Sequence, residues 1–375
     1  MPLQTTNHGM GSETPTNMAT SGHHRKKSPP PSPPPEFSHH RRPHSDRFKS
    51  RIRTPEAVII FAMVAITCLL LYHSVPYDSF AATKQLPNSK KVGELKSILK
   101  EAATSSKTII ITAVNHAWAE PNFIFDLFLE SFKFGNETRI FLKHLVVIAL
   151  DQKAYTRCLK LHPYCYNLTT KGVDFSEEAY FMAPDYLKMV WRRIDFLHTV
   201  LQLGYNFILT DADIMWFRDP FPHFHDDGDF QLACDYYRGD PIDLNNLANT
   251  GFTYVKSNKK TTKFYKFWFD SRLTYPGLHD QDVFNKIKLD PFIRHIGLKI
   301  RFLDTTFFGG FCEPSRDFDK VCTMHANCCG GLENKVHDIR IMLQDWRNYT
   351  QMLGNQTAMV RPVSWTVPQL CKIVI

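Results

Sequence analysis

The stretch FILTDADIMWF, residues 207–217, places two aspartates where one apolar segment ends and another begins. The residues FILT indicate a strand buried in the protein, and Asp211 and Asp213 follow it directly. A buried carboxylate pair is costly unless a cation or hydrogen-bond donors lie against it. The pair therefore predicts either a bound divalent metal or, alternatively, a partner such as Arg218 or the amides of a loop.

The D-x-D pattern is not specific by itself, because it occurs four times in the chain. The four pairs are Asp211/Asp213, Asp227/Asp229, Asp280/Asp282 and Asp317/Asp319. Two of them stand in HDDGDF and SRDFDK, polar contexts that are typical of solvated turns. Only the first pair ends an apolar strand, so it is the candidate metal site. Carboxylate oxygens are hard ligands, which favours Mn²⁺ or Mg²⁺ with water and phosphate oxygens completing the shell.

Apolar runs alternate with helical patterns around this stretch. KTIIITAV and HLVVIALD are nearly continuous apolar runs, typical of strands buried on both faces. Apolar residues recur at helical spacing from Leu187 to Leu201, and Gly204 follows as a cap. The alternation predicts an α/β domain with a mostly parallel sheet, whose ligands gather at the carboxyl ends of the strands. Expected strands span 107–114, 144–151, 207–210, 230–235, 252–257 and 299–308, and expected helices span 123–132, 153–161, 187–201, 261–272, 280–287 and 336–349.

The N-terminal part of the chain has a different composition. Residues 1–53 carry nine Lys/Arg against three Asp/Glu, which accounts for +6 of the net charge of +8. The charge therefore does not indicate a basic nucleic-acid-binding domain. Residues 1–56 contain SPPPSPPPEF and few aliphatic residues, so we expect a disordered cytosolic tail, with docking of its Pro runs to an SH3-like or WW-like partner as an alternative.

An uncharged apolar segment, residues 57–77, follows this tail. Its length is close to the ~20 residues that a membrane-spanning helix needs. A cleaved signal peptide is the alternative, but the preceding basic region is too long for one. Because the basic residues crowd the N-terminal side, we expect a single-pass type II signal anchor with a lumenal C-terminus. Residues 78–105 are then expected to form a stem, and residues 106–375 one lumenal domain.

Sequons and cysteines agree with a lumenal position. Four N-x-T sequons follow the apolar segment, at Asn136, Asn167, Asn348 and Asn355. Eight cysteines also follow it, and an even count in an oxidising compartment suggests disulfides. Short spacings favour the bridges Cys158–Cys165 and Cys312–Cys322, while zinc is the alternative for the cysteines between residues 312 and 329.

Several motifs occur together in an order typical of one enzyme family. They are KTIIITAVNHAWAEP, DYLKMVWRRIDFL, YNFILTDADIMWFRDPF, FQLACD, HDQDVFNKIK, FFGGFCE and VCTMHANCCGG. As a set, running from Lys107 to Trp346, they resemble the plant nucleotide-diphospho-sugar transferases of glycosyltransferase family 77. The resemblance implies a GT-A fold, in which an α/β domain binds a nucleotide sugar through a metal and the enzyme retains the anomeric configuration.

The resemblance implies a metal and diphosphate site. Asp211 and Asp213 match the metal-binding D-x-D of the family, and His325 matches a late metal-binding histidine of related retaining enzymes. A surface histidine between disulfides is the alternative for His325. Gly330 and Lys335 are the nearest equivalents of a glycine and a lysine that bind the diphosphate, although both stand two residues further apart than in the relatives' H-x-x-G-x-x-K pattern.

The resemblance also implies residues that bind the donor. Related enzymes have a basic residue shortly before the D-x-D. Arg193 flanks the apolar stripe of its helix, whereas Arg192 points away from it, so Arg193 is the candidate. Asn249 resembles an asparagine that holds the donor sugar. Thr112 and Asn115, on the first strand, occupy the position where such folds meet the nucleotide base.

The motif HDQDVF supplies the catalytic candidates Asp280, Gln281 and Asp282. Asp280 and Gln281 are expected to hydrogen-bond the sugar hydroxyls and to support the positive charge that develops at the anomeric carbon. A helix N-cap is the alternative role for Asp280. Asp280 and Asp282 remain to be tested as covalent nucleophiles, and without one a front-face displacement is expected.

The leading hypothesis is a Golgi glycosyltransferase that moves a sugar from a UDP-sugar donor to a cell-wall polysaccharide or glycoprotein acceptor. One alternative is a metal-dependent lumenal hydrolase, which needs a base to activate water, yet the chain has no HExxH or GxSxG motif. Another is a catalytically silent membrane-anchored carbohydrate-binding protein, which would tolerate loss of the motif acids. All of these acids are present.

Overall fold

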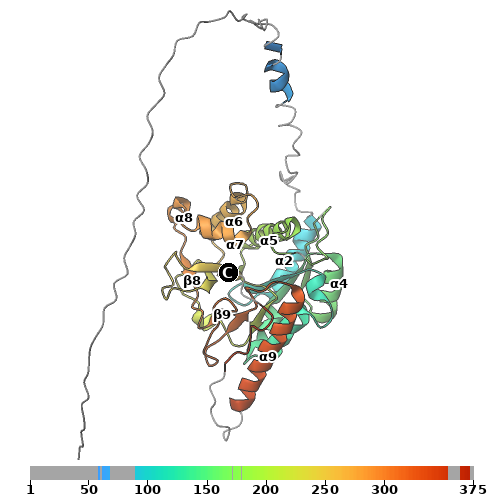
Figure 1. The fold of residues 1–375 in the computed structure, drawn as a ribbon. Coiled ribbons are helices and arrows are strands. Elements are labelled where there is room, and N and C mark those ends of the chain that lie inside the picture. The colour runs from blue at the N-terminus through green and yellow to red at the C-terminus, as the bar shows by residue number, and fades with distance from the viewer. Residues whose placement is uncertain are drawn as a thin grey trace, which may run out of the picture. The chain divides into compact units, whose positions relative to one another are not determined.

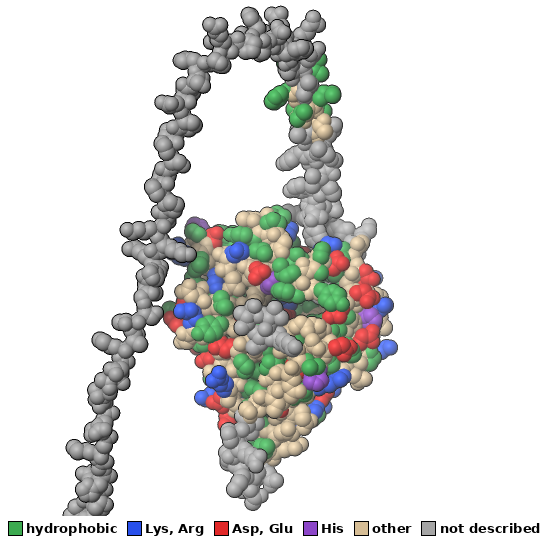
Figure 2. All heavy atoms as spheres, in the orientation of Figure 1, with side chains coloured by type: hydrophobic (Ala, Val, Ile, Leu, Met, Phe, Trp, Pro, Cys, Tyr) green, Lys and Arg blue, Asp and Glu red, His purple; other side chains and the backbone are tan. Residues whose placement is uncertain are grey.

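The N-terminal unit and the globular unit of the chain are separate. The computed structural model describes residues 58–59, 61–67, 89–170, 172–178, 180–353 and 364–371. The chain divides into residues 1–83 and residues 84–375, and residues 58–59 and 61–67 of the first unit are helical (Figure 1). Figure 2 shows the side chains of the described residues coloured by type. Within the described ranges, no helix combines the length and the apolarity needed to cross a membrane. The expected cytosolic tail, most of the expected span, the first part of the expected stem and Asn355 lie outside the described residues.

A seven-stranded sheet forms the centre of the globular unit (Figure 1). Its strand order is β3-β2-β1-β4-β7-β6-β8. The strands are β1 (Thr108–Val114), β2 (Leu145–Ala149), β3 (Cys165–Asn167), β4 (Asn206–Thr210), β6 (Phe230–Tyr236), β7 (Leu247–Val255) and β8 (Ile300–Phe302). Strand β7 runs antiparallel to β4 and β6, and the other neighbours are parallel. The expected α/β fold with a mostly parallel sheet is therefore confirmed, and β4 and β6 both end at the same edge of the sheet.

Helices cover both faces of this sheet. Ile110 of β1 belongs to an apolar cluster that includes residues of α3, α4 and α9, whereas Ile109 and Ile111 belong to a cluster with residues of α2, α5, α6 and α7. A strand that is buried on both faces explains why the run KTIIITAV does not alternate with polar residues. The helices are α2 (Ser89–Ala102), α3 (Ile124–Phe134), α4 (Gln152–Leu161), α5 (Pro184–Gln202), α6 (Lys259–Ser271), α7 (Asp280–Ile287), α8 (Pro291–His295) and α9 (Leu332–Leu353).

A second sheet of three strands adjoins the D-x-D loop. It consists of β5 (Ile214–Trp216), β10 (Thr323–His325) and β9 (Phe308–Gly310), in the order β5-β10-β9. Strand β10 is antiparallel to β5, and His325 is the register partner of Ile214. Because β5 begins directly after Asp213, this pairing brings His325 beside the D-x-D loop from a distant part of the chain.

Two segments differ from what the sequence indicates. The stem was expected to span residues 78–105, but Leu95 and Leu99 of α2 are buried in the core of the globular unit. The structure thus assigns the second half of the stem to the folded domain. One strand was expected over residues 299–308, but β8 and β9 lie in different sheets. The Asp304 carboxylate accepts the Thr306 N–H at 2.8 Å and forms a turn between them.

Three disulfides cross-link the described residues. Cys158–Cys165 is present as predicted, and the others are Cys312–Cys328 and Cys329–Cys371. The predicted Cys312–Cys322 bridge is wrong. Cys322 is free and buried, because Cys312 pairs with Cys328 and the backbone of Cys322 is bonded to Phe307 and Phe217 beside the smaller sheet. Since Cys312, Cys328 and Cys329 are in disulfides, the zinc alternative for them does not hold.

Candidate functional site

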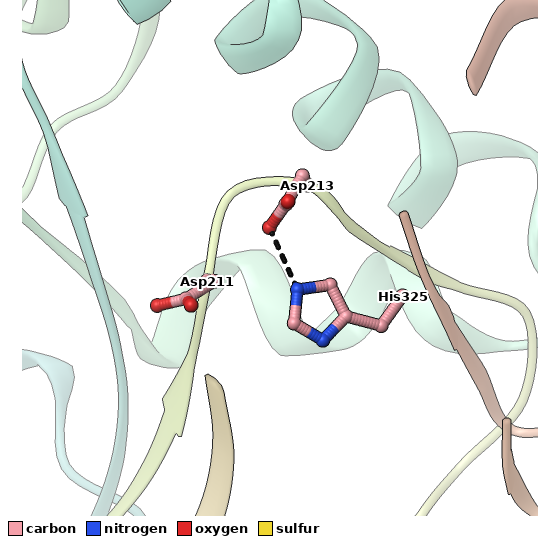
Figure 3. A group of neighbouring side chains, drawn as sticks. All are labelled: Asp211, Asp213 and His325. Atoms are coloured by element: carbon pink, nitrogen blue, oxygen red, sulfur yellow. Dashed lines mark ion pairs between the residues drawn. The ribbon is translucent and has the colours of Figure 1, made fainter. Parts of the chain in front are cut away.

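Asp211, Asp213 and His325 form one group at the carboxyl end of β4 (Figure 3). Each contributes one potential ligand atom, and these atoms lie within 4.8 Å of one another. The Asp213 backbone carbonyl accepts the Ala326 N–H at 3.0 Å, which ties the loop after β10 to the D-x-D loop. Two carboxylates and an imidazole are a donor set that suits Mn²⁺ or Mg²⁺.

The Asp213 carboxylate is buried, and only its Oδ2 atom accepts a hydrogen bond. Lys335 Nζ of α9 donates to Oδ2 at 2.6 Å, and His325 Nε2 lies 3.2 Å from Oδ1. The latter pair does not have hydrogen-bond geometry, so Oδ1 is a buried oxygen without a donor. Burial raises the pKa of the Asp213 carboxyl, but Lys335 and His325 outweigh burial and hold the pKa well below its usual range. An ionised oxygen that accepts no hydrogen bond and lies 3.2 Å from the histidine fits a metal ligand.

Arg193 of α5 joins the first aspartate to the HDQDVF motif. Its guanidinium donates to Asp211 Oδ1 through Nη1 and to Asp280 Oδ2 through Nη2, the latter at 3.0 Å. Burial raises the pKa of the Asp211 carboxyl above its ordinary value, and Arg193 opposes this. Burial likewise raises the pKa of Asp280, but Arg193 and His279 outweigh it, and the net shift is downward. The basic residue expected before the D-x-D is therefore in place, and it is Arg193 rather than Arg192.

Arg218 is not the partner of the aspartate pair, contrary to the alternative that the sequence left open. Its Nη1 donates to the carbonyls of Phe318 and Val321, and its guanidinium carbon lies 4.8 Å from the centre of the Trp346 ring. The Arg218 guanidinium therefore holds the loop of residues 318–321 against α9. The D-x-D pair is compensated by Arg193 and Lys335 instead.

Gly251 of β7 leaves space beside the metal ligands. The Asp211 N–H donates to the Gly251 carbonyl at 2.8 Å, which extends the β4–β7 pairing past the end of β4. A Cβ at position 251 would lie 2.7 Å from both Asp211 Oδ2 and His325 Cε1. Only glycine fits there without displacing a candidate ligand. Nothing in the sequence singled out Gly251, because its role depends on which side chains the two sheets bring together.

The HDQDVF motif lies at the start of helix α7, and its two aspartates differ in burial and in partners. Asp280 is buried and bonded to Arg193 and to Thr250 Oγ1, the latter at 3.3 Å. The His279 side chain, and not Asp280, caps the helix by accepting the Gln281 N–H at 3.2 Å. Asp282 is separate from this group, since its carboxylate is 45% exposed and lies 3.4 Å from His279 Nε2. Asp280 and Gln281 thus remain at the site, whereas Asp282 does not belong to it.

The donor-sugar candidate Asn249 lies in a cluster that the sequence analysis only partly anticipated. Its Nδ2 donates to Asp235 Oδ1 at 2.8 Å, and the same carboxylate accepts from Gln281 and Asn327. Asp235 and Asn327 were not predicted. The signal for Asp235 was present, because FQLACD ends an apolar strand in an aspartate just as FILTD does.

Three predicted donor-binding residues have no contact with this group. Thr112 is buried within β1, and its hydroxyl has no hydrogen-bond partner. Asn115 donates to the carbonyls of Phe175 and Glu177 at 2.9 Å each, and so holds the loop before α5 against the end of β1. A Cβ on Gly330 would meet no atom within 4 Å. Of the two predicted diphosphate residues, only Lys335 reaches the aspartates.

Tyr186 of α5 is a further residue of the site that the sequence did not reveal. Burial raises the pKa of its hydroxyl, and the Asp280 carboxylate raises it further. Its ring lies 6.3 Å from that of His279 and 5.4 Å from that of Phe181, both measured between centroids. A neutral tyrosine hydroxyl is therefore maintained beside the acidic residues.

The family model of the nucleotide-diphospho-sugar transferases matches residues 140–339, more than half of the chain. The chain belongs to this family and is a glycosyltransferase. The matched region contains the D-x-D loop, Arg193, Asp280, His325 and Lys335.

Relatives support this assignment. An uncharacterized protein of Arabidopsis thaliana is 53% identical over 75% of this chain and 74% of its own length. A beta-arabinofuranosyltransferase of the same plant is 24% identical, over 50% of this chain and 34% of its own length. A UDP-D-xylose:L-fucose alpha-1,3-D-xylosyltransferase, also from Arabidopsis thaliana, is 24% identical, over 48% of this chain and 50% of its own length. This chain spans half or less of the length of the arabinofuranosyltransferase and of the xylosyltransferase.

Proposed function

We propose that this protein is a metal-dependent, retaining glycosyltransferase of family 77 with a GT-A fold, which uses a UDP-sugar and transfers the sugar to a cell-wall polysaccharide or glycoprotein. The observation that carries this proposal is the group Asp211, Asp213 and His325, in which the Asp213 Oδ1 atom lies beside the histidine and accepts no hydrogen bond. A xylosyltransferase that uses UDP-D-xylose and an arabinofuranosyltransferase are among the relatives, which supports a pentosyl donor.

The ligand set of this group fits a divalent metal. Asp211, Asp213 and Asp280 bring three carboxylates together against the cations Arg193 and Lys335, so an added positive charge is favourable there. Asp211 Oδ2, Asp213 Oδ1 and His325 Nε2 are the atoms that would hold Mn²⁺ or Mg²⁺. When bound, the metal would neutralise the diphosphate as a Lewis acid.

Side chains of the protein would bind the diphosphate and the sugar. Lys335, directed at the D-x-D loop from α9, is suited to contact the diphosphate as it leaves. Gln281 and Asn249 would hydrogen-bond the sugar hydroxyls from the opposite side. The Asp280 carboxylate already has Arg193 and Thr250 as partners, which favours an electrostatic role over that of a nucleophile. We therefore favour front-face displacement, in which the acceptor oxygen attacks on the side from which the diphosphate departs and the departing phosphate takes the acceptor's proton.

We also propose that the protein is a single-pass type II membrane protein of the Golgi with its globular unit in the lumen. Residues 57–77 are uncharged and follow a basic tail, which supports this orientation. The three disulfides of the globular unit support an oxidising compartment.

The test is release of UDP by the purified full-length protein from a panel of UDP-sugars with Mn²⁺. We expect one donor to be hydrolysed slowly in the absence of acceptor, and EDTA to abolish the reaction. Asp213→Asn should abolish it as well, because this variant loses a charged ligand and the partner of Lys335. Arg218→Lys, at a residue that does not contact the aspartates, is a control for general effects of substitution.

Two other outcomes would contradict the proposal. Binding of a UDP-sugar without any turnover, even with glycan acceptors, would favour the carbohydrate-binding alternative. Hydrolysis of glycans without any requirement for a nucleotide sugar would favour the metal-dependent hydrolase.

A further inference from the structure

Asp235, at the end of β6, is the common hydrogen-bond acceptor of three side-chain amides. Its Oδ2 accepts from Gln281 Nε2 at 2.8 Å. Its Oδ1 accepts from Asn249 Nδ2 and from Asn327 Nδ2, each at 2.8 Å. These amides come from α7, from β7 and from the segment after β10. One carboxylate therefore joins three separate parts of the chain at the edge of the sheet that carries the metal ligands.

Each of these amides is held at its oxygen end as well. A backbone N–H can only donate and a carboxylate can only accept, so an amide placed between the two has a single allowed orientation. Asp235 is thus the group that determines which way all three amides face. The backbone donors are Thr250 N–H to Gln281 Oε1 at 3.1 Å, Gly251 N–H to Asn249 Oδ1 at 2.9 Å, and Cys312 N–H to Asn327 Oδ1 at 3.2 Å.

Gln281 is the amide that matters most for the transfer reaction, because it follows Asp280 directly in α7. The hydroxyl of Thr250 bonds Asp280, while the N–H of the same residue bonds Gln281. With both ends of its amide bound, Gln281 keeps one N–H and one oxygen lone pair for a ligand, in a fixed direction.

We propose that Asp235 is a positioning residue of the transferase: its carboxylate fixes the Gln281 amide, and through it the hydrogen bond that is offered to the donor sugar. The inference rests on the proposed function and adds to it a residue outside the D-x-D and HDQDVF motifs. It predicts that loss of Asp235 impairs the transfer step more than the binding of the nucleotide, because Asp235 binds the three amides whereas Lys335 binds Asp213.

The isosteric change Asp235→Asn isolates this role. The new amide has one oxygen and one NH₂ group where the carboxylate had two oxygens. Its NH₂ group must face either Gln281 or both Asn249 and Asn327. The first orientation is favoured, because it places two donors against each other at one contact, whereas the second does so at two contacts. Gln281 must then rotate, which turns its own NH₂ group toward the Thr250 N–H and leaves that donor unpaired.

The experiment measures kcat and KM for UDP release by the full-length protein, with the donor that the wild type hydrolyses, together with Mn²⁺-dependent UDP affinity by calorimetry. For Asp235→Asn we expect kcat to fall by about tenfold to hundredfold, with KM and UDP affinity changed less than about twofold. Asp270→Asn, which removes an exposed aspartate paired with Lys266 on α6, should leave all three values unchanged.

A double-mutant cycle distinguishes positioning from an independent role. If Asp235 acts through Gln281, Asp235→Asn adds no further loss of kcat to Gln281→Ala. The proposal would be overturned if the losses of kcat of the two single variants multiplied in the double variant. A loss of UDP affinity in Asp235→Asn as large as its loss of kcat would also overturn it.

A crystal structure of Asp235→Asn tests the same proposal without any activity. At about 1.2 Å resolution or better, where amide oxygen and nitrogen can be distinguished, we expect Gln281 Oε1 to leave the Thr250 N–H, and an oxygen that still accepts this N–H would overturn the inference. Failure of the wild type to bind or hydrolyse any UDP-sugar would instead refute the proposed function, so the two failures can be told apart.

Discussion

At the scale of single residues, the site depends on partly buried cations that hold carboxylates together. Arg193 touches both Asp211 and Asp280, and it is much less exposed than its neighbour Arg192. Removal of this partly buried guanidinium would leave the buried Asp280 carboxylate without its cation. Arg193 is therefore required for the folding of the site as well as for its electrostatic field.

Arg193→Met is expected to destabilise the protein by about 3 kcal/mol, because it leaves the buried Asp280 without its cation. The measurement is urea-induced unfolding followed by fluorescence. Arg192→Met is a matched control one residue away. It removes an exposed pair with Asp195, so its cost should stay below about 1 kcal/mol. Equal costs for the two variants would contradict the bridging role of Arg193.

Gly251→Ala should weaken the binding of Mn²⁺, since its methyl group would lie 2.7 Å from one candidate ligand and 2.7 Å from the ring of another. We expect at least a tenfold loss, on the order of the effect of disturbing the surroundings of a metal ligand. Calorimetric titration with Mn²⁺ measures it. Gly93→Ala in α2 adds a methyl group that meets no atom within 4 Å, and it should leave the affinity unchanged.

At the scale of elements, the C-terminal segment is held to helix α9 by two carboxylates, Asp345, which binds Thr366, and Asp338. Asp338 is fully buried, and its oxygens accept the N–H groups of Gln369, Leu370 and Cys371. The Cys329–Cys371 disulfide holds the same segment to the loop before α9. Burial raises the pKa of the Asp338 carboxyl, but these N–H groups and His337 outweigh it, so the pKa lies below its ordinary value.

The pKa of Asp338 is lower in the folded protein than in the unfolded chain, where it is about 3.9. The ionised carboxylate therefore stabilises the fold above about pH 3.9. This stabilisation is lost as the pH falls through the pKa of the folded state. Asp338→Asn should therefore be less stable than the wild type at pH 7, by about 1–3 kcal/mol. The difference should narrow below about pH 4. Unfolding in urea at several pH values measures this difference, and a gap that is independent of pH would refute the assignment.

At the scale of the whole molecule, the proposed topology places the tail and the globular unit on opposite sides of a membrane. Protease added to sealed microsomes should remove the tail and spare the unit of residues 84–375. Adding detergent should expose that unit to digestion. Glycosidase treatment should also lower the apparent mass, since Asn136 and Asn348 are exposed. Digestion of the globular unit in sealed vesicles would contradict the lumenal orientation.

The sequence predicted the parts of the site that are local or carried by ordered motifs. The strand FILT, the aspartates after it and the helical phase of Arg193 follow from neighbours in the chain. The pairing of β10 with β5, which delivers His325, could be expected only from the family resemblance. Asp235 was missed because three amides from separate elements give it its role. The contact of Asn115 with the nucleotide base stays a prediction, whereas its hydrogen bonds to the loop before α5 could not be predicted because no pattern placed that loop beside β1.

The Cys312–Cys328 bridge encloses His325 in its loop, and that has a consequence for how the protein is produced. The candidate metal ligand belongs to a segment that is anchored by two covalent bridges, one of which also secures the C-terminal segment. Recombinant chains made in a reducing bacterial cytosol would lack both cross-links. Failure of such material to respond to manganese would reflect incomplete maturation, and an expression host that oxidises cysteines is the appropriate source.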